Sequence, residues 1–464
     1  MIIYSIPVKS IKQKYKLPEL CDFAELRLDY LENPTRFELS NLNDKTIITI
    51  RDINEGGKNF CTLENKISYY QKAVSSSNCL VDLEIKNYTT KIPTENLIIS
   101  YHNFNEIFDH NELKKIILDS NLLSAKYLKI AVNIISYNQF LILEELVSLS
   151  NKPVILVGMG KLGKLSRLLY KHLGSVATYI ADAENKTASG QLSTKEAKLF
   201  NLNKISSQTQ IGGLIGGKQV YHSLGLTFYN NYFDKHNLNS AYFPFEVDNF
   251  DDFWFWLNKT KTTFYGFSIT MPHKSEVSKR LGFSSKFQVH NLYIPSQKKL
   301  LNTDMLAFGS ALDYLNISQN DKIMIVGTGN TAETALYALQ GFHNVIICGR
   351  NRKSGEFLSK KYSRKFHHLS DKIEQIDLLI NCTSLGLQNE DFWSETKLNK
   401  KEKAFSKIKV IDLPYAKKIS SLITHCQKKG FKYTDGEMFW KWQAERQLTE
   451  FCQAINAKEK NHAI

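Results

Sequence analysis

The chain has 464 residues, of which 42% are hydrophobic, and its formal net charge is +14. At roughly 100–200 residues per domain this length provides for several folding units, and the composition excludes an intrinsically disordered chain. No apolar run reaches the roughly 18 residues of a membrane-spanning helix, so we expect no membrane partner. The seven cysteines are scattered without CxxC spacing, which favours free thiols in a reducing, cytoplasmic compartment over disulfides or a metal site.

The positive charge has three possible origins. It can reflect a lysine-rich composition, attraction of anionic small molecules, or binding of nucleic acid. The basic residues are spread along the chain, and the densest cluster, Lys397 to Lys409, is typical of a solvated surface segment. No helix-turn-helix, RNA-recognition or zinc-finger pattern accompanies the charge, so the sequence does not support a nucleic-acid partner.

Short, apolar, β-branched segments recur over residues 1–185, and stretches with helical periodicity separate most of them. The first, residues 2–8, is predicted to be a strand and not part of a signal peptide. The others are residues 23–31, 46–51, 80–85, 97–102, 127–132, 153–160 and 176–181. About eight strands alternating with helices predict a (β/α)8 TIM barrel. Residues 200–215, rich in Asn, Ser, Gln and Gly, are typical of a linker or a domain boundary.

The second half also alternates strand-like and helix-like segments. Residues 264–274 are predicted to form a strand that ends in a loop, and residues 321–342 a strand, a glycine-containing turn and a helix. Residues 343–350, 377–386 and 409–415 are predicted as further parallel strands. This pattern predicts a smaller α/β domain followed by a doubly wound, Rossmann-type dinucleotide-binding domain.

Charged residues collect near the ends of the predicted barrel strands, which is the face that carries the active site in this fold. Glu25, Arg27 and Asp29 alternate, so we expect them on one face of a strand. Arg167 is expected to open the helix after the seventh strand. The remaining charged residues of this group are Arg51, Glu55, Asp82, Glu84, His102 and Lys129. Each alone fits a structural ion pair, but together they predict a site lined with fixed charges.

Lys129 lies inside the apolar segment YLKIAV, residues 127–132. Burial beside arginines predicts a pKa below the value of about 10.4 for a free lysine, which makes the amine a nucleophile toward a ketone. The resulting Schiff base acidifies the neighbouring C–H bond, and His102, oriented by Glu55, is placed to remove that proton. On this interpretation Lys129→Met removes a desolvated amine, so it should preserve or raise barrel stability while it abolishes the reaction.

Several of these segments resemble type I 3-dehydroquinate dehydratase over residues 1–205: ELRLD (25–29), TIRDINEGG (49–57), SYHNF (100–104), YLKIAV (127–132), GKLGKLSRL (160–168) and TASGQ (187–191). The resemblance implies that Lys129 forms the Schiff base, His102 is the general acid and base, and Glu55 pairs with His102. It implies that Arg167 holds the substrate carboxylate. It also implies that substrate hydroxyls or the lid are contacted by Glu25, Arg27, Arg51, Thr187 and Gln191.

Two further groups of residues suggest chemistry in the second half. GFSITMPHK (266–274) places Thr270 and Lys274 at a strand end, and NTDMLAF (302–308) places Asp304 at a helix start. A Lys–Asp pair can exchange a proton with a hydroxyl while hydride moves, although such a pair equally fits a surface salt bridge. IVGTGNTAE (325–333) follows a strand and opens a helix, as a pyrophosphate-binding turn does, and Arg350 suits the 2′-phosphate of NADP.

These motifs resemble shikimate dehydrogenase, together with NCTSLGL (381–387), VIDLPY (410–415) and DGEMFWKWQAE (435–445). The resemblance implies that Lys274 and Asp304 are the catalytic pair. It implies substrate contacts from Ser223, Thr270, Asn291 and Gln443, and NADP contacts from Gly327, Gly329, Asn330, Thr331 and Arg350. The second hydroxyl of the family's S-x-S pair is absent, because this chain has Ser223-Leu224-Gly225.

Together the resemblances predict a bifunctional enzyme that dehydrates 3-dehydroquinate and reduces 3-dehydroshikimate with NADPH, without a metal. The expected parts are a dehydratase (1–205), a substrate-binding domain (210–308), an NADP-binding domain (309–435) and a C-terminal helix that packs back on the substrate domain (436–464). Its partners would be small carboxylates. Two alternatives stay open: a Schiff-base aldolase joined to another NADP-dependent reductase, and a basic binding protein whose sites have decayed.

Overall fold

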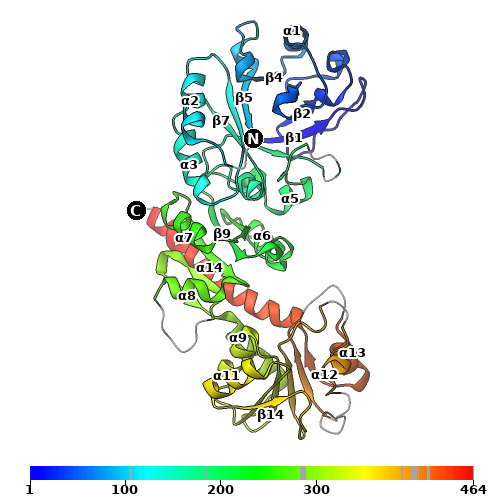
Figure 1. Cartoon of the computed structure of the whole chain (residues 1–464), viewed down its shortest axis with the longest axis vertical. Helices are drawn as coiled ribbons and strands as arrows, with labels where there is room; N and C mark the ends of the chain where they lie inside the picture. The colour runs from blue at the N-terminus through cyan, green and yellow to red at the C-terminus, as the bar shows by residue number, and fades with distance from the viewer. Residues whose placement is uncertain are drawn as a thin grey trace. The chain divides into compact units, whose positions relative to one another are not determined.

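The computed structural model describes residues 1–104, 107–182, 184, 187–282, 289–387, 390–398, 405, 407–414 and 419–462. The chain divides into two compact units, Met1–Tyr265 and Gly266–Ile464, whose elements are labelled in Figure 1. Much of the predicted surface segment between Lys397 and Lys409 lies outside the described residues, as does residue 415 of the VIDLPY motif.

The first unit begins with an 8-stranded parallel sheet in the order β7-β6-β5-β4-β3-β2-β1-β8. The strands are β1 (Ile2–Pro7), β2 (Phe23–Arg27), β3 (Thr46–Thr49), β4 (Leu80–Glu84), β5 (Leu97–Asn103), β6 (Tyr127–Asn133), β7 (Val154–Met159) and β8 (Thr178–Ile180). The Val176 amide donates to the Val154 carbonyl at 2.9 Å, which brings the two ends of the sheet together. The sheet is therefore a nearly closed barrel, and the predicted TIM-barrel architecture is confirmed.

Helices and short 3-10 turns connect the barrel strands. The helices are α1 (Leu63–Ser77), α2 (His110–Ser120), α3 (Asn138–Val147), α4 (Gly163–Leu168) and α5 (Thr194–Leu199). The side chains of Thr62 and Asp109 cap α1 and α2 by accepting from backbone amides of the first turn, which fixes where these helices begin. Apolar side chains from successive strands form one buried cluster, which includes Ile3, Ile47, Leu80, Ile98, Ala131 and Ile155.

Two predictions about where elements begin or end are wrong: one concerns the second strand, and the other concerns the helix after the seventh strand. The second strand stops at Arg27, and Asp29 lies in the 3-10 turn η1 (Leu28–Tyr30), so Asp29 does not share a strand face with Glu25. The turn lets the Asp29 carboxylate accept two hydrogen bonds from Arg27, at 2.8 Å from Nε and 2.9 Å from Nη2. Arg167 lies in the last turn of α4 and does not open that helix.

A second lobe completes the first unit. It contains β9 (Gln210–Gly216), η8 (Lys218–His222), α6 (Leu224–Lys235), β10 (Ser240–Glu246) and α7 (Phe250–Lys259), and β9 pairs in parallel with β10. Residues 210–215, predicted as linker, are thus part of a buried strand. A Cβ on Gly213 would lie 2.0 Å from the Phe243 carbonyl oxygen, so glycine here serves close strand packing and not flexibility.

The second lobe packs against the barrel through α3 and α7. The Tyr137 amide donates to Asp252 at 2.6 Å, and the Tyr137 hydroxyl donates to the Glu246 carbonyl at 3.0 Å. The Tyr137 ring also packs edge-on against Phe253, with centroids 5.1 Å apart.

The second unit opens with the end of β11 (Phe264–Ile269). Strand β12 (Leu292–Ile294) pairs antiparallel with β11, and β13 (Lys299–Leu301) pairs antiparallel with β12. Helices α8 (Glu276–Arg280) and α9 (Thr303–Leu315) accompany these strands. The last helix, α14 (Gly436–His462), packs on α9, where Phe439 lies 4.8 Å from Phe308 between ring centroids.

A 6-stranded parallel sheet follows in the order β16-β15-β14-β17-β18-β19. Its strands are β14 (Lys322–Val326), β15 (Asn344–Gly349), β16 (Lys365–His368), β17 (Leu378–Asn381), β18 (Lys409–Asp412) and β19 (Tyr433–Thr434). The accompanying helices are α10 (Asn330–Ala338), α11 (Arg352–Tyr362), α12 (Phe392–Thr396) and α13 (Ser421–Lys429). Alternate residues of β14 enter two different core clusters, one with Ile323 and the other with Met324. A parallel sheet buried on both faces is the predicted Rossmann-type architecture.

Within the described ranges, no helix combines the length and the apolar character that crossing a membrane requires.

Candidate active sites

A cavity of about 150 Å³ in the barrel brings together the nine residues to which the resemblance gives a role in catalysis or substrate binding. Asp29, Asp82 and Glu84, which belong to the predicted group of charges, do not line it. Arg51 and Glu55 follow β3, His102 lies near the end of β5, and Lys129 lies in β6. Parallel strands end at the same rim of a barrel, which explains why residues far apart in the chain converge there. The predicted residues that line the cavity are Glu25, Arg27, Arg51, Glu55, His102, Lys129, Arg167, Thr187 and Gln191.

The Lys129 side chain is held between two carboxylates. Its residue is 5% exposed, and Nζ donates to Glu25 Oε1 at 3.1 Å and to Asp82 Oδ2 at 2.8 Å. The Tyr179 ring lies below the ammonium, with its centroid 4.5 Å from Nζ. The lysine is therefore tolerated in this buried strand because it is paired on two sides.

The predicted low pKa of Lys129 is wrong for this state of the protein. Burial alone would lower the pKa, but the charges of Asp82 and Glu25 outweigh it and raise the pKa of Lys129 above its usual value. The same pairing, joined by Arg51 and Arg27, lowers the pKa of Asp82 and of Glu25 despite their burial. Before substrate arrives, Lys129 is thus an ammonium that is neutralised in place.

His102 and Glu55 form the predicted pair. His102 Nδ1 lies 3.0 Å from Glu55 Oε2. Burial, followed by the nearby charges of Arg51 and Lys129, lowers the pKa of His102 well below its usual value, so the imidazole is neutral at pH 7. Burial raises the pKa of Glu55 to about 7 although Arg51 opposes it. When Glu55 is ionised it accepts from Nδ1–H, which leaves Nε2 as the basic nitrogen.

Arg167 is a buried cation that has spare hydrogen-bond donors. It is 1% exposed, and Nη1 donates to the Tyr179 carbonyl at 3.3 Å. Its Nε and Nη2 have no hydrogen-bond partner among the described residues, and burial lowers the pKa of Arg167 to about 10. Such a guanidinium is suited to bind a carboxylate in a bidentate manner, by donating one hydrogen bond to each carboxylate oxygen. Nearby, Gln191 Oε1 accepts from the Thr187 amide at 2.8 Å, which ties down the segment before α5.

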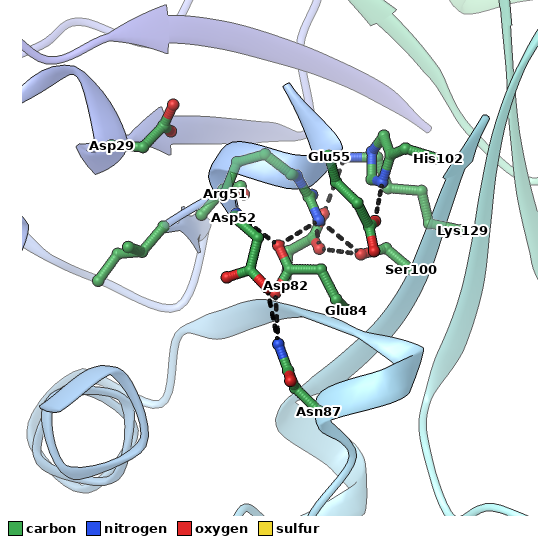
Figure 2. Close-up of polar contacts among 12 residues, drawn as sticks. Asp29, Arg51, Asp52, Glu55, Asp82, Glu84, Asn87, Ser100, His102 and Lys129 are labelled. Atoms are coloured by element: carbon green, nitrogen blue, oxygen red, sulfur yellow. Dashed lines mark hydrogen bonds and ion pairs between the residues drawn. The ribbon is translucent and has the colours of Figure 1, made fainter. Parts of the chain in front are cut away.

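Arg51 is the centre of a polar network that the motifs only partly indicated (Figure 2). Its guanidinium contacts Asp82 at 2.7 Å, Glu84 at 2.9 Å and Ser100 at 2.8 Å. Lys66, Lys86 and Tyr179 were missed by the sequence analysis. They stand in no motif, and an isolated lysine in a helix or turn carries no signal that it points inward.

The predicted catalytic pair of the second half forms within the second unit. Lys274 Nζ lies 2.7 Å from Asp304 Oδ2, with side chains that are 19% and 14% exposed. Lys274 lies in η9 (His273–Ser275) just after β11, and Asp304 lies in the first turn of α9. The Asn302 side chain caps α9 by accepting from the Met305 amide, which fixes the start of the helix that carries Asp304.

Asn291 and Gln443 are also brought together. Asn291 Nδ2 donates to Gln443 Oε1 at 3.1 Å, and Asn291 Oδ1 accepts from the Thr303 amide at 2.7 Å. Gln447, which the sequence analysis missed, donates to the Asn291 carbonyl at 3.2 Å.

Thr270 follows the last residue of β11, and its carbonyl accepts from the His273 amide at 3.0 Å. Ser223 belongs to the first unit, where its hydroxyl accepts from the Gly225 amide at 3.1 Å and caps α6.

A cavity of about 270 Å³ at the carboxyl end of β14 is lined by Gly327, Gly329 and Arg350. Gly327 has φ of +128°, and a Cβ there would lie 3.0 Å from the Cys382 carbonyl oxygen, whereas Gly329 has open space around it. Asn330 and Thr331 form the first turn of α10 and are not among the lining residues. Exposed backbone at a helix start beside an arginine fits the phosphates of a dinucleotide. Across the described part of the chain, no group of three His, Cys, Asp or Glu side chains is arranged to hold a metal.

Comparison with known proteins gives a match for each part of the chain. Residues 5–204 match the model of type I 3-dehydroquinase, residues 215–285 that of the shikimate dehydrogenase substrate binding domain, and residues 310–428 that of shikimate / quinate 5-dehydrogenase. The chain is 26% identical to a bifunctional 3-dehydroquinate dehydratase/shikimate dehydrogenase, chloroplastic, of Arabidopsis thaliana, over 97% of this chain and 81% of the relative.

Two further similarities differ in how much of the chain they cover. A shikimate dehydrogenase (NADP(+)) of Clostridium botulinum is 29% identical over 52% of this chain and 95% of the relative. A solved structure of dehydroquinate dehydratase and shikimate dehydrogenase from S. pombe AroM covers 98% of this chain and 97% of its own, with 20% identity and a TM-score of 0.42.

Proposed function

Since this chain joins a type I 3-dehydroquinase to a shikimate dehydrogenase, we propose a role for each residue that lines its two sites. The enzyme dehydrates 3-dehydroquinate to 3-dehydroshikimate through a lysine Schiff base and reduces 3-dehydroshikimate to shikimate with NADPH. Both are steps of the shikimate pathway, and both substrates are small carboxylates.

In the barrel, Arg167 binds the substrate carboxylate through its two free N–H groups. Glu25, Arg27, Arg51, Thr187 and Gln191 contact the substrate hydroxyls or the segment that covers them. The observation that carries this assignment is the buried Arg167 guanidinium without a partner for Nε and Nη2 among the described residues. A buried donor of this kind is costly until a ligand accepts from it.

The Lys129 amine, once deprotonated, attacks the ketone carbon and water leaves, so that an iminium forms. His102 Nε2 removes the proton from the adjacent carbon, and the resulting enamine expels the hydroxyl group with a proton from the same imidazolium. A second water then hydrolyses the iminium and frees Lys129. The steps release two waters and consume one, which balances the loss of one water from 3-dehydroquinate.

In the second unit, Lys274 donates a proton to the substrate oxygen that becomes a hydroxyl, and Asp304 holds Lys274 in place. Thr270, Asn291 and Gln443 are the proposed substrate contacts of this unit, and Ser223 keeps its predicted role as a substrate contact. NADPH supplies the hydride when bound. Its pyrophosphate would meet the turn formed by Gly327, Gly329, Asn330 and Thr331, and its 2′-phosphate would meet Arg350.

The test supplies purified full-length protein with 3-dehydroquinate and NADPH. We expect the ultraviolet absorbance of the conjugated product to rise and NADPH to be consumed in turn. Borohydride added with 3-dehydroquinate should attach the substrate skeleton to Lys129, as located by peptide mass spectrometry, and should not label Lys129→Met. No absorbance change with 3-dehydroquinate would contradict the dehydratase role and would leave an aldolase for a different substrate as the alternative.

We also propose the four parts 1–205, 210–308, 309–435 and 436–464, and a cytoplasmic location. The start of β9 at Gln210 supports the first boundary, and the start of α14 at Gly436 supports the third. The second boundary, between residues 308 and 309, falls inside α9, which runs from Thr303 to Leu315. The cysteines of the chain are free thiols, which suits a reducing compartment. Fractionation of the source cells followed by immunoblotting tests the location.

A further inference from the structure

Lys86 contacts the barrel site although none of the steps above uses it. It lies in η5 (Ile85–Asn87), directly after β4, and its side chain is 45% exposed. Its Nζ lies 3.4 Å from Glu55 Oε1. The other oxygen of that carboxylate, Oε2, lies 3.0 Å from His102 Nδ1. Lys86 and His102 thus occupy the two oxygens of one carboxylate.

Asp52 holds Lys86 in this position. Lys86 Nζ lies 3.4 Å from Asp52 Oδ2, and Asn87 donates to the same oxygen at 3.0 Å (Figure 2 shows Asp52 and Asn87). Lys66, which is 1% exposed, donates to Asp52 Oδ1 at 2.7 Å and to Glu84 Oε2 at 2.8 Å. A long, partly exposed lysine is normally free to move, but this one is aimed by a carboxylate that is itself fixed from the interior.

The other charged groups around Glu55 come from three strands and their ends. Arg51 after β3 favours the ionised form, and Glu84 of β4 opposes it. Arg51 is already bound to Asp82 and Glu84, so much of its charge is compensated. Among the described residues, His102 and Tyr101 of β5 also lie near Glu55. Both are uncharged at neutral pH, since the pKa of His102 is lowered and that of Tyr101 is raised. Lys86 is therefore the cation aimed at Glu55 from the solvent side.

We propose that Lys86, aimed by Asp52, is a positioning residue of the dehydratase that keeps Glu55 ionised and thereby keeps His102 in its basic tautomer. This inference rests on the roles proposed above for Glu55 and His102. An ionised Glu55 accepts from Nδ1–H and leaves the Nε2 lone pair free. A protonated Glu55 donates to Nδ1 and places the ring proton on Nε2, where the imidazole cannot accept a proton from substrate.

The direction of the pH effect follows. Burial already raises the pKa of Glu55 to about 7, so loss of a cation at 3.4 Å raises it further. Dehydration requires the ionised form, hence activity is lost as pH falls through this pKa, and the loss begins at higher pH without Lys86. For a partly exposed pair we expect a shift of about half to one pH unit.

The experiment measures kcat/KM for dehydration by full-length Lys86→Met, Lys86→Arg and wild type from about pH 5.5 to about pH 9. Lys86→Met should lose about three- to tenfold at the acid end and approach wild type at the alkaline end. Lys86→Arg keeps the cation and should restore the wild-type profile. Lys91→Met, which removes an exposed lysine of the same connection between β4 and β5, is the matched control and should leave the profile unchanged.

If Lys86→Met loses kcat/KM by the same factor at every pH, the proposal is overturned, because such a loss indicates a merely structural role. If kcat/KM of Lys86→Met does not change, the proposal is overturned as well, because Lys86 then has no role. The rate of 3-dehydroshikimate reduction by the same samples serves as a control, because it shows whether the second half of each variant is intact. His102→Ala separates this inference from the proposed function. If His102→Ala still dehydrates, the assigned base is wrong, whereas an inactive His102→Ala beside an unchanged Lys86→Met contradicts the role of Lys86 alone.

Discussion

The two proposed catalytic lysines of this chain are each paired with an aspartate, yet they stand in opposite physical settings. Lys129 is enclosed by Asp82 and Glu25, with side chains 6% exposed or less, and a chain of further charges extends behind them. Lys274 has Asp304 as its ion-pair partner, at 19% and 14% exposure. Removing one member of a buried network costs several kcal/mol, whereas removing one member of a single, partly buried pair costs less.

The difference shows how each site obtains a reactive lysine. In the barrel Asp82 and Glu25 stabilise the ammonium form of Lys129, so its proposed role as a nucleophile requires that substrate binding first removes a proton from it. In the second unit Lys274 is partly buried against one aspartate, and its proposed role is to donate a proton. On the proposed roles, the same pair of residue types would serve nucleophilic catalysis in one unit and proton donation in the other, because burial and the number of carboxylates differ.

The largest effect should come from Lys129→Met. We expect dehydration to fall by about 10⁴-fold or more, since the covalent step is lost, and reduction of 3-dehydroshikimate to be unchanged. The variant should also lower the free energy of unfolding of the first unit by about 3–5 kcal/mol, because Glu25 and Asp82 stay buried without their cation. Coupled assays and urea denaturation measure both effects.

The stability loss should depend on pH in a defined direction. Asp82 and Glu25 have pKa values in the folded protein that are lower than their ordinary values of 3.8 and 4.5. Their pairing with Lys129 therefore stabilises the folded protein fully at pH values above these ordinary pKa values, and less as the pH falls below them. The difference in free energy of unfolding between wild type and Lys129→Met should therefore become smaller as the pH is lowered. A variant as stable as wild type at neutral pH would contradict the network and would support the earlier expectation of a costly, unpaired amine.

Lys274→Ala should separate activity from stability in the second unit. We expect reduction to fall by about 10²- to 10⁴-fold through loss of the proton donor, with dehydration unchanged. The free energy of unfolding should change by about 1–2 kcal/mol, less than in Lys129→Met, because Lys274 has one carboxylate partner and the pair is only partly buried. Steady-state rates and urea denaturation of the same preparation test this, and a stability loss as large as that of Lys129→Met would remove the contrast between the two lysines.

Arg350→Leu should change the choice of nucleotide. Loss of the cation that would meet the 2′-phosphate should raise KM for NADPH by about 10- to 100-fold and leave KM for NADH unaltered. NADH serves as the internal control, since it lacks that phosphate. Equal effects on both nucleotides would place Arg350 elsewhere in the binding site.

Gly225→Ser should have the smallest effect. It restores the second hydroxyl of the S-x-S pair, and its Cβ would lie 3.2 Å from the Tyr229 ring and 3.3 Å from Ser223 Oγ, so both must shift slightly. We expect KM for 3-dehydroshikimate to fall by about two- to tenfold, the value of one neutral hydrogen bond. Gly225→Ala adds the Cβ without the hydroxyl, and an equal effect of both variants would assign the change to packing.

Much of the barrel and its site could be predicted from the sequence. Apolar segments at regular spacing predicted the strands, and the motifs identified the charged residues that line the cavity. The strand β9 was missed because its glycines resemble those of a linker, although here they permit close packing against β10. Asp29 was placed on a strand face because the alternation of charges continues past the point where β2 ends.

The sequence alone determines the succession of strands along the chain and the family motifs, because hydrophobic period and motif spacing are local properties. The same motifs single out the candidate catalytic residues Lys129, His102, Glu55, Lys274 and Asp304. The sequence alone does not determine the charge state of Lys129. Glu25 and Asp82 lie 104 and 47 residues away along the chain, and barrel closure alone brings them within hydrogen-bond distance of Nζ. Lys66 and Lys86 likewise acquire their partners through folding. Electrostatic energy depends on distances in space, so the tertiary structure decides which of these charges are paired and which stay available for chemistry.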